Sequence, residues 1–196
     1  QSLLRTGAFM NDQTKRKPEK PVATVEHVTG LSTAALHDLC DATDVAIEAG
    51  GGFGWVRLPA RDILERYWQG VMTMPARMLF VARLDGVICG TAQLVLPPRN
   101  NEAQSFSVQL TTTFVAPWAR GYGLARMLIK KAEDMAREEG FSVINLDVRE
   151  TQDAAIALYE SMGYVHCGTY PYYARVENEI VEGRYYYKVI DPDSVE

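Results

Sequence analysis

The sequence predicts a single α/β domain in which helices flank a mixed, mostly antiparallel sheet, an arrangement that also fits the α+β class. Three observations lead to this prediction. Apolar residues alternate with polar ones in several short runs and recur at helical spacing in others. The dipeptide Asp85-Gly86 separates two apolar runs, which is a strong hairpin signal. The chain has 196 residues, 47% of them hydrophobic, which suffices for one domain with a full core.

The first part of the chain combines a polar leader with a strand and a helix. Residues 11–21 are polar, charged and proline-bounded, so we expect a flexible leader over 1–21. Within it, residues 1–9 are either vector-derived or a truncation remnant, and Met10 is a candidate start. Residues 22–28 alternate as a half-buried strand does. Helical spacing over 33–49 predicts a helix, which a run of glycines ends.

The middle of the chain predicts a helix followed by three strands. Pro59 suits the first turn of a helix over 60–72. Residues 77–96 read as two strands joined at Asp85-Gly86. A long run over 105–116 is rich in β-branched residues and predicts a further strand.

The last third alternates helices and strands. A helix follows Gly123 and ends before Gly140, which suits a helix C-terminus. The remaining pattern predicts, in order, a strand over 142–148, a helix over 152–162, a strand over 164–170, a loop over 171–183 and a strand over 184–190. The expected element order is therefore β-α-α-β-β-β-α-β-α-β-β.

Composition and charge argue against several classes of protein. A formal net charge of -5 disfavours a nucleic-acid binder. Cys40, Cys89 and Cys167 are far apart and have no histidine cluster nearby, so we expect neither a disulfide framework nor a metal site. No apolar run approaches the roughly 20 residues that span a bilayer. The start of the chain also lacks the apolar core of a signal peptide. We therefore expect a cytoplasmic protein without nucleic-acid or membrane partners.

The stretch Arg120-Gly-Tyr-Gly123 lies at the mouth of a helix, directly after a strand. The first N–H groups of a helix lack backbone partners and carry partial positive charge, and glycines let a phosphate approach them. Arg120 adds a charged donor. A dinucleotide fingerprint needs glycine where Arg126 stands, and the Gly-Lys-Ser/Thr of a P-loop is missing. The stretch therefore predicts either another kind of pyrophosphate cradle or a sharp turn that only needs glycine.

Two motifs resemble the GNAT superfamily of acyl-CoA-dependent N-acyltransferases. The sequence V-x-P-x-x-R-G-x-G-x-A over 115–125 resembles motif A, whose pattern Q/R-x-x-G-x-G/A is met by Arg120, Gly123 and Ala125. The sequence A-x-x-L-Y-x-x-x-G-Y over 155–164 resembles the second signature of the family. The element order and the spacing of the motifs also match. The resemblance therefore implies a GNAT acetyltransferase domain over 22–196.

The resemblance implies that acetyl-CoA is the co-substrate. Its pantetheine arm would lie between two parallel strands that splay apart near Val115 and Asp147. Gln152 stands where relatives often carry Asn. Lys130 and Arg126 are candidates for an outer phosphate contact, although each also suits a solvated helix face. The cofactor-binding residues implied are Phe114, Val115, Arg120, Gly121, Tyr122, Gly123, Leu124, Ala125 and Gln152.

Acetyl transfer to an amine needs a group that takes a proton from the amine and a donor for the leaving thiolate. An alkyl amine with a pKa near 10.4 is almost fully protonated at pH 7. The resemblance implies that Tyr159 is the donor; the alternative is a packing residue on its helix. The strand before motif A carries no carboxylate, so Asp147 is the candidate base, with Glu150 and a relayed water as the others. Asp147 equally suits an ordinary polar residue or a helix-side cap. A backbone N–H of Phe114 or Val115 would stabilise the oxyanion.

Two segments are candidates for the acceptor site. The glycine-rich connection that carries Phe53 and Trp55 is either a mobile lid or a surface linker. Tyr170, Tyr172 and Tyr173 would line a pocket, although a homodimer surface would have the same composition. These segments resemble the tabtoxin-resistance acetyltransferase group, which acetylates a small amino-acid-like toxin.

The resemblance thus implies transfer of an acetyl group from acetyl-CoA to a primary amine of a small molecule, by direct attack in a ternary complex. The alternative within the enzyme class is a protein or peptide N-terminal acetyltransferase. The alternative outside it is a non-catalytic acyl-CoA-binding module.

Overall fold

The computed structural model describes residues 19–51 and 53–195. The strands are β1 (Ala23–Val28), β2 (Arg77–Leu84), β3 (Val87–Val95), β4 (Ser107–Val115), β5 (Val143–Arg149), β6 (Val165–Val176) and β7 (Glu179–Val189). The helices are α1 (Thr33–Glu48), α2 (Arg61–Thr73), α3 (Leu124–Glu138) and α4 (Asp153–Ser161). The element order is the one that the sequence predicts. Most of the expected leader, residues 1–18, lies outside the described residues.

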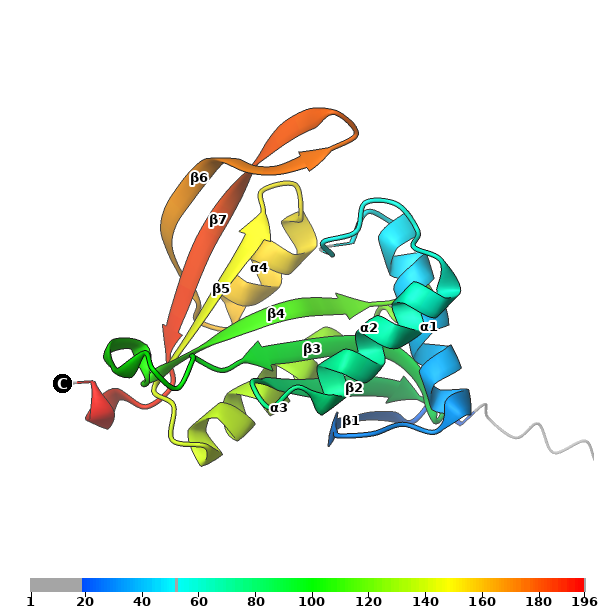
Figure 1. Cartoon of the computed structure of the whole chain (residues 1–196), viewed down its shortest axis with the longest axis horizontal. Coiled ribbons are helices and arrows are strands. Elements are labelled where there is room, and N and C mark those ends of the chain that lie inside the picture. Colours follow the sequence, from blue (N-terminus) through cyan, green and yellow to red (C-terminus); the bar gives the residue numbers. More distant parts are fainter. Residues whose placement is uncertain (1–18, 52, 196) are drawn as a thin grey trace, which may run out of the picture.

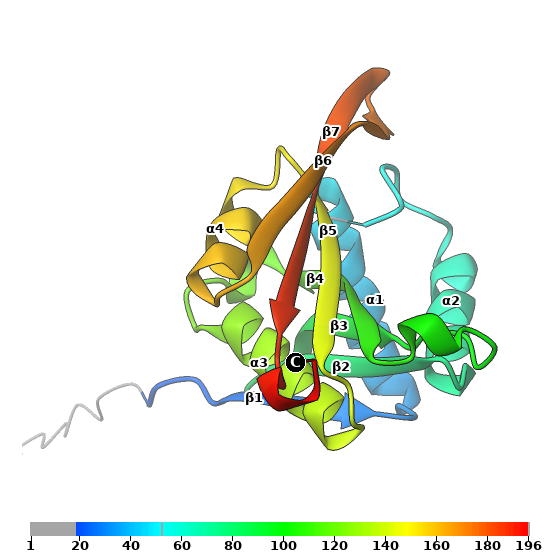
Figure 2. The same ribbon diagram turned by 90° about the vertical axis from the view of Figure 1, so that its left-hand side faces the viewer.

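The described strands form one mixed sheet in the order β1-β2-β3-β4-β5-β7-β6. Among them, β4 and β5 are the parallel pair, and the other neighbours run antiparallel. Helices α1 and α2 cover one face of the sheet and α3 and α4 the other, as Figures 1 and 2 show. One core includes Leu39 and Trp68, and the core on the opposite face includes Leu128 and Ile144. The predicted α/β fold is confirmed. No helix in the described part of the chain is long and apolar enough to cross a membrane.

Local sequence signals set several element bounds. Helix α1 begins after Ser32, whose hydroxyl accepts a hydrogen bond from the Ala35 N–H at 3.2 Å. Asp85 and Gly86 adopt φ of 49° and 85°, the left-handed pair that a tight hairpin requires, which confirms the β2–β3 hairpin. Helix α2 begins at Arg61 after the cap residue Ala60. The proline before Ala60 therefore precedes the cap, and the prediction that it occupies the first helical turn is wrong.

The expected loop over 171–183 is mostly strand. Strand β6 continues to Val176 and β7 begins at Glu179, with Glu177 and Asn178 in the left-handed conformation of a tight turn. Pro171 lies in an irregular stretch of β6 where the register with β7 shifts. Because β6 is an edge strand, a residue without an N–H is tolerated there. Figure 1 shows that the β6–β7 hairpin extends beyond the ends of the other strands.

Strands β4 and β5 pair over a short stretch and then diverge. The pairing joins Ser107–Gln109 to Val143–Asn145. Beyond it, β4 contains an irregularity against β3, with Thr112 at a φ of 51°. An extra residue in one strand bends that strand and increases its twist. The result is an opening between the two strands, which is visible in Figure 1.

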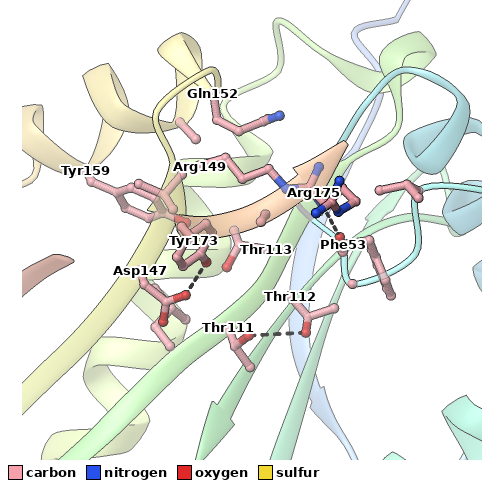
Figure 3. Close-up of a pocket in the computed structure, with 16 residues that line it drawn as sticks. Phe53, Thr111, Thr112, Thr113, Asp147, Arg149, Gln152, Tyr159, Tyr173 and Arg175 are labelled. Carbon is pink, nitrogen blue, oxygen red and sulfur yellow. Dashed lines mark hydrogen bonds between the residues drawn. The ribbon is translucent and has the colours of Figure 1, made fainter. Parts of the chain in front are cut away.

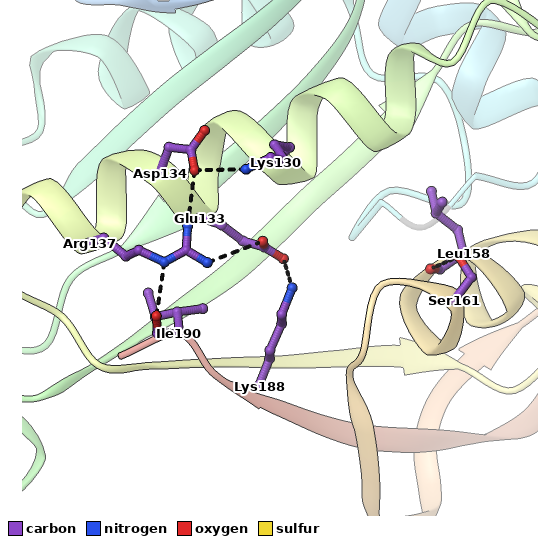
Figure 4. A network of polar contacts seen from close by, with 8 residues as sticks. All are labelled: Lys130, Glu133, Asp134, Arg137, Leu158, Ser161, Lys188 and Ile190. Carbon is purple, nitrogen blue, oxygen red and sulfur yellow. Dashed lines mark hydrogen bonds and ion pairs between the residues drawn. The ribbon is translucent and has the colours of Figure 1, made fainter. Parts of the chain in front are cut away.

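A buried ion pair joins α3 to β7 and so fixes the helix against the sheet. Glu133 is 2% exposed and accepts a hydrogen bond from Lys188 Nζ at 2.8 Å. Arg137 lies 3.8 Å from the same carboxylate and donates to the Ile190 carbonyl at 2.9 Å. Figure 4 shows these contacts and also Asp134, which pairs with Arg137 at 2.9 Å and with Lys130 at 3.1 Å on the exposed side of α3. The start of α3 lies beside the end of β4, where Ala125 and Val115 line the same cavity.

Candidate active site

Three adjoining cavities follow the opening between β4 and β5. Cavity A, of about 530 Å³, is bounded by β4, β5, β6 and the α1–α2 connection. Cavity B, of about 350 Å³, lies between β4 and α4, and cavity C, of about 210 Å³, lies at the start of α3. Cavities A and B share Thr113, Gln152, Ala155 and Tyr159. Because B and C also share wall residues, the three form one row from the hairpin to α3.

The start of α3 offers backbone donors to cavity C. Gly121 and Gly123 have φ of 87° and 74°, and a Cβ at either would meet nothing within 4 Å. The Met127 N–H bonds to the Gly123 carbonyl at 3.1 Å, so the N–H groups of the three residues before Met127 precede the helical bonding pattern. Donors of this kind at the positive end of a helix bind anions. The predicted residues that line cavity C are Val115, Arg120, Gly121, Gly123, Leu124, Ala125 and Arg126.

Other candidates for the phosphate contacts lie elsewhere. Tyr122 is 44% exposed and is not among the residues that line the three cavities. Lys130 pairs with Asp134 at 3.1 Å, one turn along α3. Arg126 lines cavity C and also donates to Ser161 Oγ at 2.9 Å. Of the two basic residues considered for an outer phosphate contact, Arg126 lines one of the three cavities and Lys130 does not.

The Tyr159 side chain lies in the wall between cavities A and B. It comes from α4 and is 7% exposed. Burial raises the pKa of Tyr159, and the nearby Asp147 carboxylate raises it further. The phenol therefore stays protonated at neutral pH and can donate a proton or a hydrogen bond. The neighbouring Thr113 Oγ1 is buried without a hydrogen-bond partner among the described residues.

Asp147 on β5 is hydrogen-bonded to side chains of two other strands at cavity A, and Figure 3 shows its bond to Tyr173. Its carboxylate accepts hydrogen bonds from Gln109 Nε2 on β4, at 2.8 Å, and from the Tyr173 hydroxyl on β6. Burial and the bond to Asp147 raise the pKa of Tyr173. A Cβ at Gly183 would lie 2.1 Å from Tyr173 Cγ, so glycine on β7 makes room for this ring. The irregular stretch of β6 and this glycine together turn Tyr173 toward Asp147.

Glu150 lies outside the cavities. Its carboxylate pairs with Arg184 Nη2 at 3.2 Å, and it is not among the residues that line cavity A. Of the two carboxylates considered as the base, Asp147 lines cavity A, which Tyr159 also lines, and Glu150 does not.

Two side chains tether the glycine-rich α1–α2 connection to the end of β5. Gln152 Nε2 donates to the Gly50 carbonyl at 2.7 Å, and Arg149 donates to the Phe53 carbonyl. Phe53 is 5% exposed and lines cavity A. Trp55 stacks on it at 5.6 Å between ring centroids without lining a cavity. The connection therefore forms one wall of cavity A.

The three tyrosines considered for the acceptor pocket lie in different environments. Tyr173 lines cavity A, whereas Tyr170 and Tyr172 are 49% and 74% exposed and lie outside it. The sequence reasoning missed Arg149 and Arg175, which both line cavity A. Arg149 had a usable signal, because it follows Asp147 by two residues and so shares its side of the strand. Arg175 fell within the segment that was expected to be a loop.

Within the described residues, no group of three or more His, Cys, Asp or Glu side chains is arranged to hold a metal ion. The three cysteines are free, and Cys40 and Cys89 are buried.

Comparison with known proteins identifies a protein family and individual proteins that match this chain. The model of the acetyltransferase (GNAT) family matches residues 42–164, which include both sequence motifs. An Azospirillum brasilense protein, described as an uncharacterized N-acetyltransferase in the hisH-hisA intergenic region, is 65% identical over 129 residues, which are 66% of this chain and 77% of that protein. The N-alpha-acetyltransferase RimI of Mycobacterium tuberculosis is 35% identical over 95 residues, which are 48% of this chain and 56% of that protein.

Solved structures share the fold at low sequence identity. An N-acetyltransferase from Staphylococcus aureus Mu50 has a TM-score of 0.74 at 16% identity, over 87% of this chain and 99% of that one. The acetyltransferase yncA of Salmonella typhimurium, described as putative and solved with acetyl-CoA, has a TM-score of 0.71 at 18% identity, over 87% of this chain and 95% of that one. The family match covers more than half of the sequence and both motifs. The chain therefore belongs to the acetyltransferase (GNAT) family and is an N-acetyltransferase.

Proposed function

We propose that this N-acetyltransferase moves an acetyl group from acetyl-CoA to a primary amine of a small molecule, by direct attack in a ternary complex. The observation that carries the proposal is the wall shared by cavities A and B, because Tyr159 lines both. A group in this wall can contact a thioester in cavity B and an amine in cavity A together. The volume of cavity A, about 530 Å³, lies in the range of small-molecule sites.

The residues of cavities B and C fit the chemistry of acetyl-CoA. The backbone N–H groups at the start of α3 and the Arg120 side chain would hold the pyrophosphate, since both favour anions. The backbone of Phe114 and Val115 would hold the pantetheine, because β4 beyond Gln109 has no pairing with β5 in the described sheet. Gln152, the cap residue before α4, would close the far side of this channel. Acetyl-CoA, when bound, supplies the acetyl thioester that the amine attacks.

Asp147 and Tyr159 would divide the proton transfers between them. The Asp147 carboxylate faces cavity A, where it binds the incoming ammonium group and takes a proton from it. The bonds from Gln109 and Tyr173 hold this carboxylate in place. The Tyr159 hydroxyl remains protonated because burial raises its pKa, so it donates to the leaving sulfur.

A second candidate function is acetylation of a protein or peptide N-terminus. It is favoured by the similarity to RimI, which is named as an N-alpha-acetyltransferase. A peptide would need cavity A to continue into a groove, but Phe53 and the β6–β7 hairpin bound that cavity on two sides. The sequence resemblance to the tabtoxin-resistance group also favours a small acceptor. We therefore retain the small amine as the proposed substrate.

A melting experiment and a turnover assay test the proposal together. Acetyl-CoA at 100 times its dissociation constant should stabilise the full chain by about 2.7 kcal/mol. The protein is then incubated with acetyl-CoA and either small primary amines or peptides with free N-termini, and released CoA is detected as a thiol. We expect faster turnover of small amines. A melt that acetyl-CoA does not shift would overturn the proposal, and a preference for peptides would support the second candidate.

A further inference from the structure

Cavity A contains more positive than negative charge. Its charged side chains are Asp147, Arg149 and Arg175. The Asp147 carboxylate already accepts hydrogen bonds from Gln109 and Tyr173. Neither guanidinium forms an ion pair with a carboxylate of the described residues, although seven other arginine or lysine side chains of that part of the chain do. Two arginines facing one cavity without acidic partners are suited to an anionic ligand.

The positions of these groups divide cavity A into two ends. Figure 3 shows Asp147, Tyr173 and Tyr159 together on one side. Arg149 extends toward Phe53, whose carbonyl accepts one of its bonds, and Arg175 lies beside it. Arg149 comes from β5 and Arg175 from the edge strand β6, so the anion-binding end is built from two separate strands. One bond to the Phe53 carbonyl leaves most of the five guanidinium donors of Arg149 for a ligand.

We propose that the acceptor amine also carries a carboxylate, which Arg149 and Arg175 bind at one end of cavity A while the amine reacts at the Asp147–Tyr159 end. The inference rests on the proposed function and specifies its substrate class as a small, amino-acid-like zwitterion. A guanidinium holds a carboxylate through two parallel hydrogen bonds, which fixes both position and direction. Such a contact would point the amine toward the wall shared with cavity B. A polycationic amine, by contrast, would meet two like charges there.

Matched acceptor pairs test this inference in the 196-residue chain with acetyl-CoA. We would compare 4-aminobutanoate with 4-aminobutanamide, and methionine with methioninamide, by following CoA release. We expect kcat/KM to be about tenfold or more higher for the acid of a preferred pair, since a site built for a charged group rejects the analogue that lacks it. An acid-to-amide ratio near one for every pair that is turned over would overturn the inference while leaving the proposed function standing.

Arginine variants test whether the preference for the acid over the amide arises in cavity A. R175Q should raise the KM for the acid and bring the acid-to-amide ratio close to one, and R175K should restore part of the ratio by restoring the charge. R184Q is the matched control, because Arg184 lies on the same hairpin, pairs with Glu150 and does not line cavity A. We expect R184Q to keep the wild-type ratio. An equal loss of the ratio in R175Q and R184Q would overturn the assignment, since it would reflect damage to the hairpin.

Failure of the proposed function can be told apart from failure of this inference. If acetyl-CoA shifts the melt but no amine is turned over, calorimetry on the CoA-saturated protein compares binding of each acid with its amide. Tighter binding of the acid that R175Q removes supports an anion-binding cavity A. Equal binding of acid and amide overturns it.

Discussion

The Tyr159 hydroxyl is the single group on which the proposed chemistry depends most directly. Its contribution grows only as negative charge develops on the leaving sulfur, so its loss should lower kcat and leave acetyl-CoA affinity unchanged. We expect Tyr159→Phe to lower kcat by about 10²- to 10⁴-fold, or about 3 to 5 kcal/mol, in a CoA-release assay. The ring remains in the variant, so its melt should stay close to the wild-type value.

Tyr164 provides a matched control for this variant. It packs against Tyr159 at 5.7 Å between ring centroids, and its buried hydroxyl has no hydrogen-bond partner among the described residues. We expect Tyr164→Phe to keep wild-type kcat and to fold at least as stably, because it removes a buried polar group that lacks a partner. Wild-type kcat in Tyr159→Phe, with chemistry still rate-limiting, would show that the proton donor is another group.

At the scale of elements, the turn into α3 combines a backbone requirement with a binding surface. Gly123 and Gly140 flank the same helix, with φ of 74° and 86°, and a Cβ at either would meet nothing within 4 Å. Alanine at either position should cost about 1–2 kcal/mol of folding free energy, because both impose a left-handed conformation. Only Gly123→Ala should also weaken the stabilisation by acetyl-CoA, since its Cβ would enter cavity C.

The melting temperature of each variant is measured with and without acetyl-CoA. Gly140→Ala serves as the control for strain alone, because Gly140 lies at the opposite end of α3. If acetyl-CoA stabilises both variants as strongly as the wild-type chain, cavity C does not hold the pyrophosphate.

At the scale of the whole molecule, the Glu133–Lys188 pair links the helix layer to the sheet. Removing one partner leaves a buried charge without its counterion, which typically costs about 3–5 kcal/mol. We therefore expect Lys188→Ala, which leaves the buried Glu133 carboxylate without this partner, to lower the free energy of unfolding in urea by that amount. Lys130→Ala is the control, because Lys130 and Asp134 form an exposed pair whose loss should cost about 1 kcal/mol or less. Equal losses in the two variants would show that the buried pair adds nothing beyond a surface contact.

Buried acids give the folded chain a distinct response to alkaline pH. Burial raises the pKa of the Cys40 and Cys89 thiols to about 11, and it raises the pKa of Tyr159, Tyr164 and Tyr173 above the usual range. The folded state therefore holds these protons at pH values where the unfolded chain has lost them. Stability is fully present below about pH 8.5, the ordinary thiol value, and is lost progressively as pH rises through 9 to 11.

Melting temperatures measured between about pH 8 and pH 11 would check this expectation. Tyr164→Phe removes one of the titrating groups, so its melting temperature should fall less steeply above about pH 10, the ordinary phenol value. A melting temperature that stays constant through this range would contradict the raised pKa values.

Several features of the fold could be predicted from the sequence because they depend on interactions within a few residues. The Asp85-Gly86 turn, the Ser32 cap and the glycines before α3 act within a few residues of the chain, so their signals can be read directly. The β6–β7 hairpin escaped prediction because Pro171 usually marks a break, and only its place on an edge strand makes it compatible with a sheet.

The same distinction applies to the candidate site. The sequence by itself determined the family, the order of elements and the glycine-rich start of α3, because these reside in contiguous motifs. Only the tertiary structure showed that Tyr173 hydrogen-bonds to Asp147 and that Arg175 and Arg149 line the same cavity. It also showed that Tyr170 and Tyr172 are exposed. Those contacts depend on the register of β5, β7 and β6, which joins residues far apart in the chain and is set by packing of the whole sheet rather than by any local pattern.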